Sequence, residues 1–223
     1  MPDFNVIANV SQTLVGFVTK ALVVLDPTGA VTAPVSMLHD LQSDPVPPKG
    51  KGGVVAVTLV EAREDKTSRN RPRVASGSQV SGRIDTKKPP MALTLRYLMT
   101  PWSLPLPGES HQEERFLEHR MLGRVAQAFY DEPILSGTDL HGDGEPDSFD
   151  EQLQTGLAGS DDSLKISLAQ LSFEEQTRFW HAVQRKYRVS LTYDVRVVNL
   201  EPTRIQSDSL VSDREIRYGV LKP

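Results

Sequence analysis

The side chains best suited to chemistry in this sequence are five histidines, in a chain of 223 residues that has no cysteine. They are His39, His111, His119, His141 and His181. None occurs in the HExxH or HxH spacing that brings two imidazoles to one metal ion. The lack of cysteine excludes disulfides, thiolate nucleophiles and thiolate metal ligands. We therefore expect ordinary surface or capping histidines, with no metal and no cofactor.

An acidic segment at residues 139–162, called the acidic loop below, is the second candidate for ion binding. Its carboxylates, with no Lys or Arg between them, are Asp139, Asp143, Glu145, Asp147, Asp150, Glu151, Asp161 and Asp162. Asp143, Glu145 and Asp147 alternate as the first ligands of an EF-hand do. Pro146 and Ser148 break that loop pattern. We interpret the segment as a solvated acidic loop.

Sequence signatures of nucleophiles and phosphate sites are also missing. There is no G-x-S-x-G, no Walker A loop and no G-x-G-x-x-G. Gly50, Gly52 and Gly53 precede a predicted strand, whereas phosphate-binding glycines follow a strand and begin a helix. The sequence therefore predicts no enzyme. An enzyme with an unmarked site stays an alternative, and it would need a deep pocket with two converging carboxylates.

Two glutamates one helical turn apart, Glu114 and Glu118, could in principle act as a carboxylate pair. Arg115 and Arg120 lie close by in the sequence. Charges of opposite sign at this spacing are typical of a salt-bridged helix surface. We interpret the group as a solvent-exposed face of a helix.

Composition narrows the class of protein. Hydrophobic residues make up 38% and charged residues 24%, with a net charge of −4, as in an ordinary globular domain. This balance gives no general attraction to nucleic acid or to anionic membranes. The first residues resemble no signal peptide, and no window approaches the roughly 20 apolar residues of a membrane span. We expect a protein that acts in the cytoplasm or leaves it only inside a larger particle.

The first half of the chain predicts one helix and two strands. Apolar residues at steps of three and four from Ile7 to Leu25 predict a helix, and residues 31–53, rich in Pro and Gly, predict mostly loop. Residues 54–62 are apolar at both odd and even positions, which face opposite sides of a sheet. This pattern is typical of an interior strand covered on both faces. Residues 91–99 alternate between apolar and polar, as a strand with one buried face does.

The second half predicts two helices that each begin with a capping box. Ser110 with Glu113 begins a helix that ends before Pro133, and Ser172 with Glu175 begins another. The expected buried residues of the second helix are Trp180, Val183 and Tyr187. Alternating residues predict a short strand at 164–171 and a strong one at 189–197.

These elements predict an α/β (α+β) domain over residues 1–200, with a single sheet packed by helices and a C-terminal extension at 201–223. The two central strands are joined by residues 63–88, called the basic arm, with eight basic and three acidic residues. Arg69, Arg71 and Arg73 lie near its middle. The arm has no aromatic residue for stacking on nucleic acid, so a protein contact is the favoured interpretation over a phosphate backbone.

Several blocks of the sequence resemble the cap, or tail-terminator, proteins of extracellular contractile injection systems such as antifeeding-prophage and virulence-cassette particles. They are residues 4–14 (FNVIANVSQTL), 92–100 (ALTLRYLMT), 118–125 (EHRMLGRV) with 133–135 (PIL), and 164–195, which ends in YRVSLTYDV. The blocks are specific as an ordered set that covers residues 4–200. The basic arm and the acidic loop depart from the family pattern, so no contact residue is carried over to them.

The resemblance implies a phage tail-terminator-like fold and a structural role without a reaction. It implies a homohexameric ring that sits on the last ring of the inner-tube protein and grips the last ring of the sheath protein. Self, tube and sheath would be its partners, with no nucleic acid, membrane or small-molecule substrate. An adaptor of the same particle that forms no ring is the alternative.

Two interface hypotheses follow from the residues. In a ring, Arg69, Arg71 and Arg73 of one subunit could meet Asp143, Glu145 and Asp147 of the next, because the two segments have opposite charge. In the C-terminal extension, Ile216, Tyr218 and Val220 alternate, and this segment could add a strand to the edge of a sheath subunit's sheet. A loose or self-packed C-terminus is the alternative.

Overall fold

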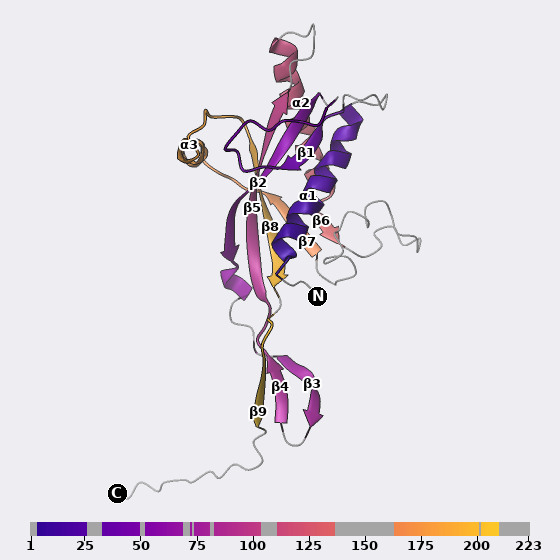
Figure 1. The fold of residues 1–223 in the computed structure, drawn as a ribbon, viewed down its shortest axis with the longest axis vertical. Helices are drawn as coiled ribbons and strands as arrows, with labels where there is room; N and C mark the ends of the chain where they lie inside the picture. Colours follow the sequence, from indigo (N-terminus) through magenta and orange to yellow (C-terminus); the bar gives the residue numbers. More distant parts are fainter. Residues whose placement is uncertain are drawn as a thin grey trace, which may run out of the picture.

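The computed structural model describes residues 4–25, 33–49, 52–68, 72, 74–80, 83–103, 111–136, 163–200 and 202–209 (Figure 1). The helices are α1 (Val6–Leu22), α2 (His111–Asp131) and α3 (Phe173–Ala182), with short 3-10 helices η1 (Val23–Leu25) and η2 (Lys66–Ser68). The strands are β1 (Val35–Leu38), β2 (Gly53–Glu64), β3 (Val74–Val80), β4 (Arg83–Lys87), β5 (Met91–Ser103), β6 (Ile134–Ser136), β7 (Ser163–Leu168), β8 (Leu191–Leu200) and β9 (Ile205–Ser209).

A six-stranded sheet forms the body, in the order β1-β2-β5-β8-β7-β6. β1 runs parallel to β2, and the other neighbours are antiparallel. β2 is an interior strand, and its residues from Val54 to Val57 are all buried, so both of its faces are covered. The predicted interior strand and the predicted α/β class with helices packed on a sheet are thereby confirmed.

One face of this sheet is covered by α1 and α2, which pack side by side. The predicted apolar stripe of α1 is confirmed, with Val10, Leu14 and Val18 fully buried in the main core. Phe17 of α1 stacks on Phe129 of α2 with ring centroids 5.0 Å apart. As predicted, α2 ends just before Pro133, which cannot continue a helix.

Helix α1 and the turn after it, Val6–Leu25, are long and apolar enough by composition to cross a membrane, with a mean hydropathy of 1.4. The expectation that no window approaches such a span is therefore wrong for this segment, because valine and leucine outweigh its scattered polar residues. Half of the segment is nevertheless buried inside the protein. A helix of the protein core meets the same criterion, and α1 is such a helix.

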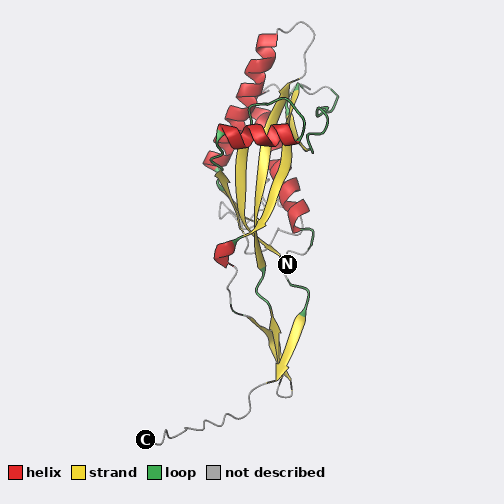
Figure 2. Ribbon diagram, turned by 90° about the vertical axis from the view of Figure 1, so that its left-hand side faces the viewer, coloured by secondary structure: helices red, strands yellow, loops and turns green. Residues whose placement is uncertain are grey.

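The opposite face of the sheet carries α3, which crosses the strands in Figure 2, and the segment after β1, which packs there through Leu41. Trp180 of α3 packs with Val54, Leu98 and Trp102 in a second, smaller core. The capping box of α3 is confirmed: Ser172 Oγ accepts the N–H of Glu175, and Glu175 accepts the N–H of Ser172. The predicted burial is confirmed for Trp180 and wrong for Tyr187, which follows the helix and is exposed.

A second sheet of three strands, in the order β3-β4-β9, projects from one end of the body (Figure 1). It continues the antiparallel pair β5–β8, because β4 leads into β5 and β9 follows β8. Pro89, Pro90 and Pro202 lie at the junction, where each removes a backbone donor that the ladder would need. Much of the basic arm is thus paired strand, in β3 and β4, rather than a simple connection between the two central strands.

Residues 31–53 also differ in part from the prediction, because they contain β1. Ser36 of this strand is held by α1: its backbone N–H donates to Thr19 Oγ1 at 3.0 Å, and its hydroxyl donates to the Val15 carbonyl. Four residues after a proline carry too little alternation to be recognised as a strand. Pairing with β2 and contact with α1 create this strand.

Candidate interaction surfaces

A row of three charged side chains crosses the middle of the sheet on the face that carries α3. The strand register places Glu61 of β2 opposite Arg96 of β5, and Arg96 opposite Asp194 of β8. Arg96 Nε donates to Asp194 Oδ1 at 2.8 Å and Nη2 donates to Oδ2 at 3.1 Å, while Nη1 lies 3.2 Å from Glu61 Oε2. The hydrogen bond to Asp194 is the main cause that raises the pKa of Arg96, so the guanidinium stays charged.

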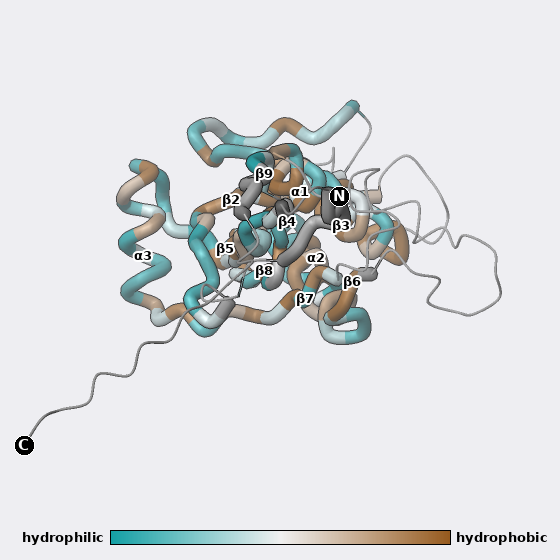
Figure 3. Tube along the Cα trace, turned by 90° about the horizontal axis from the view of Figure 1, so that it is seen from below, coloured by the Kyte–Doolittle hydropathy of each residue, from teal (hydrophilic) through white to brown (hydrophobic). Residues whose placement is uncertain are grey.

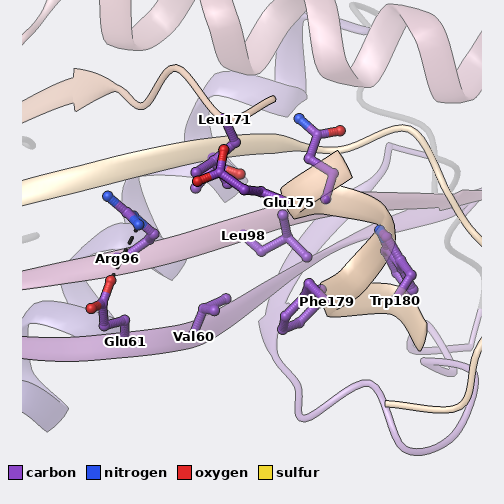
Figure 4. A pocket seen from close by; sticks show the side chains of 10 residues that line it. Val60, Glu61, Arg96, Leu98, Leu171, Glu175, Phe179 and Trp180 are labelled. Carbon is purple, nitrogen blue, oxygen red and sulfur yellow. Dashed lines mark ion pairs between the residues drawn. The ribbon is translucent and has the colours of Figure 1, made fainter. Parts of the chain in front are cut away.

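Beside this row, a cavity of about 320 Å³ lies between α3 and the sheet (Figure 4). Its walls are mostly apolar, with Leu98 on the sheet and Phe179 and Trp180 on the helix. Among the described residues, the buried hydroxyl of Thr192, which also lines the cavity, has no hydrogen-bond partner. The cavity therefore combines apolar walls with a charged end, as a site for an inserted side chain would.

This cavity also contains two carboxylates, Glu61 and Glu175, which is the feature that the enzyme alternative requires. Glu61 is paired with Arg96. The hydrogen bonds from the backbone and then the side chain of Ser172 lower the pKa of Glu175. A general acid needs a raised pKa. Glu175 is therefore a capping residue rather than a candidate acid.

A second charged group joins α2, β5 and the segment that follows α3. Glu118 is only 8% exposed, so its interpretation as part of a solvent-exposed helix face is wrong. Its carboxylate accepts hydrogen bonds from Arg115 at 2.7 Å and from Arg188 at 3.2 Å, and Ser103 also donates to it. The Arg188 guanidinium lies 4.7 Å from the ring centre of Trp102, a cation–π arrangement. Glu118 is thus a tertiary contact between distant segments.

The residues singled out from the sequence as interface residues all lie outside the described part of the chain. They are Arg69, Arg71 and Arg73 of the basic arm, Asp143, Glu145 and Asp147 of the acidic loop, and Ile216, Tyr218 and Val220 near the C-terminus. The Ser110 half of the first capping box also lies outside it. The proposed contacts of these residues stay predictions.

Two of the described histidines make hydrogen bonds to residues close to them in the sequence. His39 Nδ1 accepts the backbone N–H of Leu41 at 2.9 Å, and His111 pairs with Glu114 at 3.0 Å. Within the described residues no group of His, Asp and Glu is arranged to hold a metal ion. His141 lies outside the described part of the chain.

Sequence reasoning identified Arg96 and Asp194 as polar positions of two strands but did not bring them together. The alternation that marks each strand fixes which residues share a face. It does not fix which residue lies opposite which, and that register creates the row from Glu61 to Asp194.

Solved structures that are similar to this chain include the following two. The PVC sheath/tube terminator of an extracellular contractile injection system, in its extended state, is 18% identical, with 94% of this chain and 64% of that chain covered and a TM-score of 0.46. The anti-feeding prophage cap, a tube terminating cap, is 14% identical, with 75% and 50% covered and a TM-score of 0.45. This chain therefore spans less than two thirds of either protein.

No curated protein matches the sequence. The family model described as the Pvc16 N-terminal domain matches residues 9–214, which is nearly the whole chain. The match confirms the relationship that the sequence motifs predict. The chain belongs to the Pvc16 N-terminal domain family.

Proposed function

We propose that this chain is a structural cap that ends the inner tube and the sheath of a contractile, phage-tail-like injection particle. The family match over residues 9–214 is the observation that carries the proposal. The motif blocks at 92–100 and 118–125, which resemble cap proteins, both fall inside the matched region. In this role the chain stops polymerisation and anchors the last sheath layer, and it transforms no substrate.

A cap must present one surface that matches the growing tube and another that does not copy it. The two sheets of this chain suit that division. The body is a broad sheet with helices on both faces and with β1 and β6 at its edges, whereas the projecting sheet is narrow, with three strands and with β3 and β9 at its edges. Edge strands leave a row of backbone donors and acceptors available for pairing with another protein. We assign tube contact to the body and sheath contact to the projecting sheet.

The assembly that this role requires is a ring of identical subunits, six in the family that the sequence resembles. Subunits assemble in the cytoplasm on the end of the tube and leave the cell only as part of the particle. The opposite charges of the basic arm and the acidic loop strengthen contacts between neighbours at low salt. A non-ring adaptor remains the second candidate, since one copy per particle would also use the projecting sheet.

Electron microscopy of particles made with and without the chain tests the cap role. Tubes that are ragged or overlong in its absence support the proposal, whereas particles of normal length and normal ends rule it out. Counting subunits at the tube end separates a ring from the adaptor. Reversing the charges of Arg69, Arg71 and Arg73 should reduce the fraction of capped ends at low salt. Equal capping by the variant and the wild type would remove the role of the arm.

A test of the C-terminal extension needs a truncation that leaves both sheets intact. Removing residues 203–223 would also remove β9 and with it one strand of the projecting sheet. Removing residues 210–223 spares β9 and deletes Ile216, Tyr218 and Val220. If these residues add a strand to a sheath subunit, the shorter truncation should leave the cap on the tube and detach the sheath. Normal sheath attachment would exclude strand addition.

A further inference from the structure

Within the described part of the body, two apolar surfaces are open to solvent. The first, called the cleft, has a volume of about 620 Å³ and is lined by Ala126, Gln127, Phe129, Tyr130, Pro133, Ile166, Leu168 and Tyr193. The second, called the aromatic knob, is formed by Phe173 at the start of α3 and Tyr187 after its end. Exposed apolar surfaces of this kind mark sites of protein interaction.

The cleft lies where the end of α2 meets β7. Its floor belongs to the main core through Phe129, Ile166 and Tyr193, which are buried. Its rim is open, because Tyr130 is 85% exposed and Leu168 is 57% exposed. A concave apolar site with an aromatic residue on its rim suits an inserted apolar side chain, and such pockets contain the strongest contacts of protein interfaces.

The aromatic knob is held in place although it faces solvent. Phe173 is 71% exposed and Tyr187 is 39% exposed. Their rings make an edge-to-face contact at 5.3 Å, and the Tyr187 hydroxyl donates to Gln176 Oε1 at 3.2 Å. Aromatic residues with a fixed position lose little conformational freedom on binding, so they are effective anchors.

The two surfaces lie on opposite sides of the subunit. The cleft is on the face of the sheet that carries α1 and α2, near β7, whereas α3 packs on the other face against β2 and β5. Viewed along the long axis in Figure 3, α3 lies at one side and β6 and β7 lie at the other. A contact between two different surfaces on opposite sides of a subunit is head-to-tail. Such contacts form a closed ring when the rotations between successive subunits add up to a full turn.

One pair of charges that neighbour the two surfaces in sequence is also complementary. Asp131 follows Tyr130 at the rim of the cleft, and Lys186 precedes Tyr187 in the knob. Both side chains are exposed, and neither has an ion-pair partner among the described residues. A second copy of this chain that presents its knob to the cleft would bring these two charges to the same interface. Such pairs favour one orientation of docking over others.

We propose that the aromatic knob of one copy, Phe173 with Tyr187, inserts into the cleft of the next copy and forms the contact between subunits of the cap ring. The inference rests on the proposed ring and names the surfaces that build it. It places α3 at the subunit boundary and leaves the projecting sheet free for sheath contact.

Cysteine cross-linking in assembled particles tests this contact, because the chain has no cysteine of its own. Gln127 lies on the cleft and Glu174 follows Phe173, and both side chains are exposed. The variant with Gln127→Cys and Glu174→Cys should give a ladder of self-multimers with a short bifunctional thiol reagent. The control pair, Gln127→Cys with Gln12→Cys, uses an exposed residue of α1 and should give no ladder.

The outcomes separate the contact from the cap role. Capped particles without a ladder, or a cross-link from position 127 to a sheath or tube subunit, would overturn the contact and leave the cap proposal standing. Particles that end normally without the chain would overturn the cap role, whatever the gel shows.

Substitution of the knob gives an independent measurement. Phe173→Ser should lower the fraction of capped ends at least tenfold, while Phe116→Ser, at a half-exposed position of α2 outside both surfaces, should leave it unchanged. Asp131→Lys and Lys186→Asp should each weaken capping, and the two changes together should restore part of it. Equal capping by the Phe173 and Phe116 variants, or no recovery in the double charge variant, would contradict the contact.

Discussion

Arg96 and Asp194 lie opposite each other on adjacent strands and form two parallel hydrogen bonds, at 2.8 and 3.1 Å. Asp194 is buried, so Arg96 replaces hydrogen bonds that its carboxylate would otherwise make to water. Removing one member of such a pair leaves an uncompensated charge inside the protein. The Arg96–Asp194 pair therefore stabilises the observed register of β5 and β8, because another register would separate the two charges.

Arg96→Met should lower the free energy of unfolding by about 2 kcal/mol. The loss is smaller than that for a fully buried pair, because Arg63 lies 3.7 Å from Asp194 and can replace part of the interaction. Arg178→Met, which breaks the exposed pair with Glu174, should cost about 0.5 kcal/mol or less. Urea unfolding of both variants measures the difference, and equal losses would contradict the importance of burial.

Gly53→Ala should destabilise the protein by about 1–3 kcal/mol, since a methyl group there would overlap its surroundings. An added Cβ would meet the backbone oxygen of Trp102 at 2.9 Å and Met121 Cε at 3.2 Å. Gly16 in α1 and Gly123 in α2 have nothing within 4 Å of the same atom. Alanine at either helical position should instead stabilise by about 0.5–1 kcal/mol. Thermal unfolding of the three variants tests whether the changes in stability have these opposite signs.

Ser172→Ala should cost about 1 kcal/mol by removing the N-cap of α3, measured by urea unfolding at neutral pH. The Ser172 backbone N–H, which alanine keeps, and the Ser172 hydroxyl, which alanine removes, both lower the pKa of Glu175 in the folded state. The stability linked to this carboxylate is therefore present above its ordinary pKa and lost as the pH falls through the folded value. The gap between wild type and variant should narrow below about pH 4. A gap that is independent of pH would contradict the contribution of the Ser172 hydroxyl to the lowered pKa.

Burial raises the pKa of Tyr97 to about 12, against a smaller opposing effect of its hydrogen bond with Ser11 at 2.8 Å. A raised folded pKa means stability that is present below the ordinary value near 10 and lost as the pH rises toward 12. Tyr97→Phe should thus be less stable than wild type by about 1 kcal/mol at pH 8, because the hydrogen bond is lost. The difference should shrink or reverse at pH 11, and a constant difference would contradict the buried neutral phenol.

Local pattern determined the elements that have clear periodicity. The stripe of α1, the alternation of β5 and β8 and the capping box of α3 each arise from residues a few positions apart, so the sequence alone predicts them. The same reasoning identified Arg96 as a polar-face residue of its strand. The absence of cysteine and of catalytic spacing, read together with the motif blocks, pointed to the family that the match over residues 9–214 confirms.

Tertiary structure decided what depends on segments far apart in the chain. β1 exists because β2 and α1 hold it, and the basic arm becomes strands because β9 returns from beyond position 200 to pair with β4. Glu118 is buried because Arg188 and Ser103 come to it from other elements. The cleft and the aromatic knob also arise only in the folded protein. Contacts of this kind are fixed by register and packing across the whole chain, and local periodicity carries no information about either.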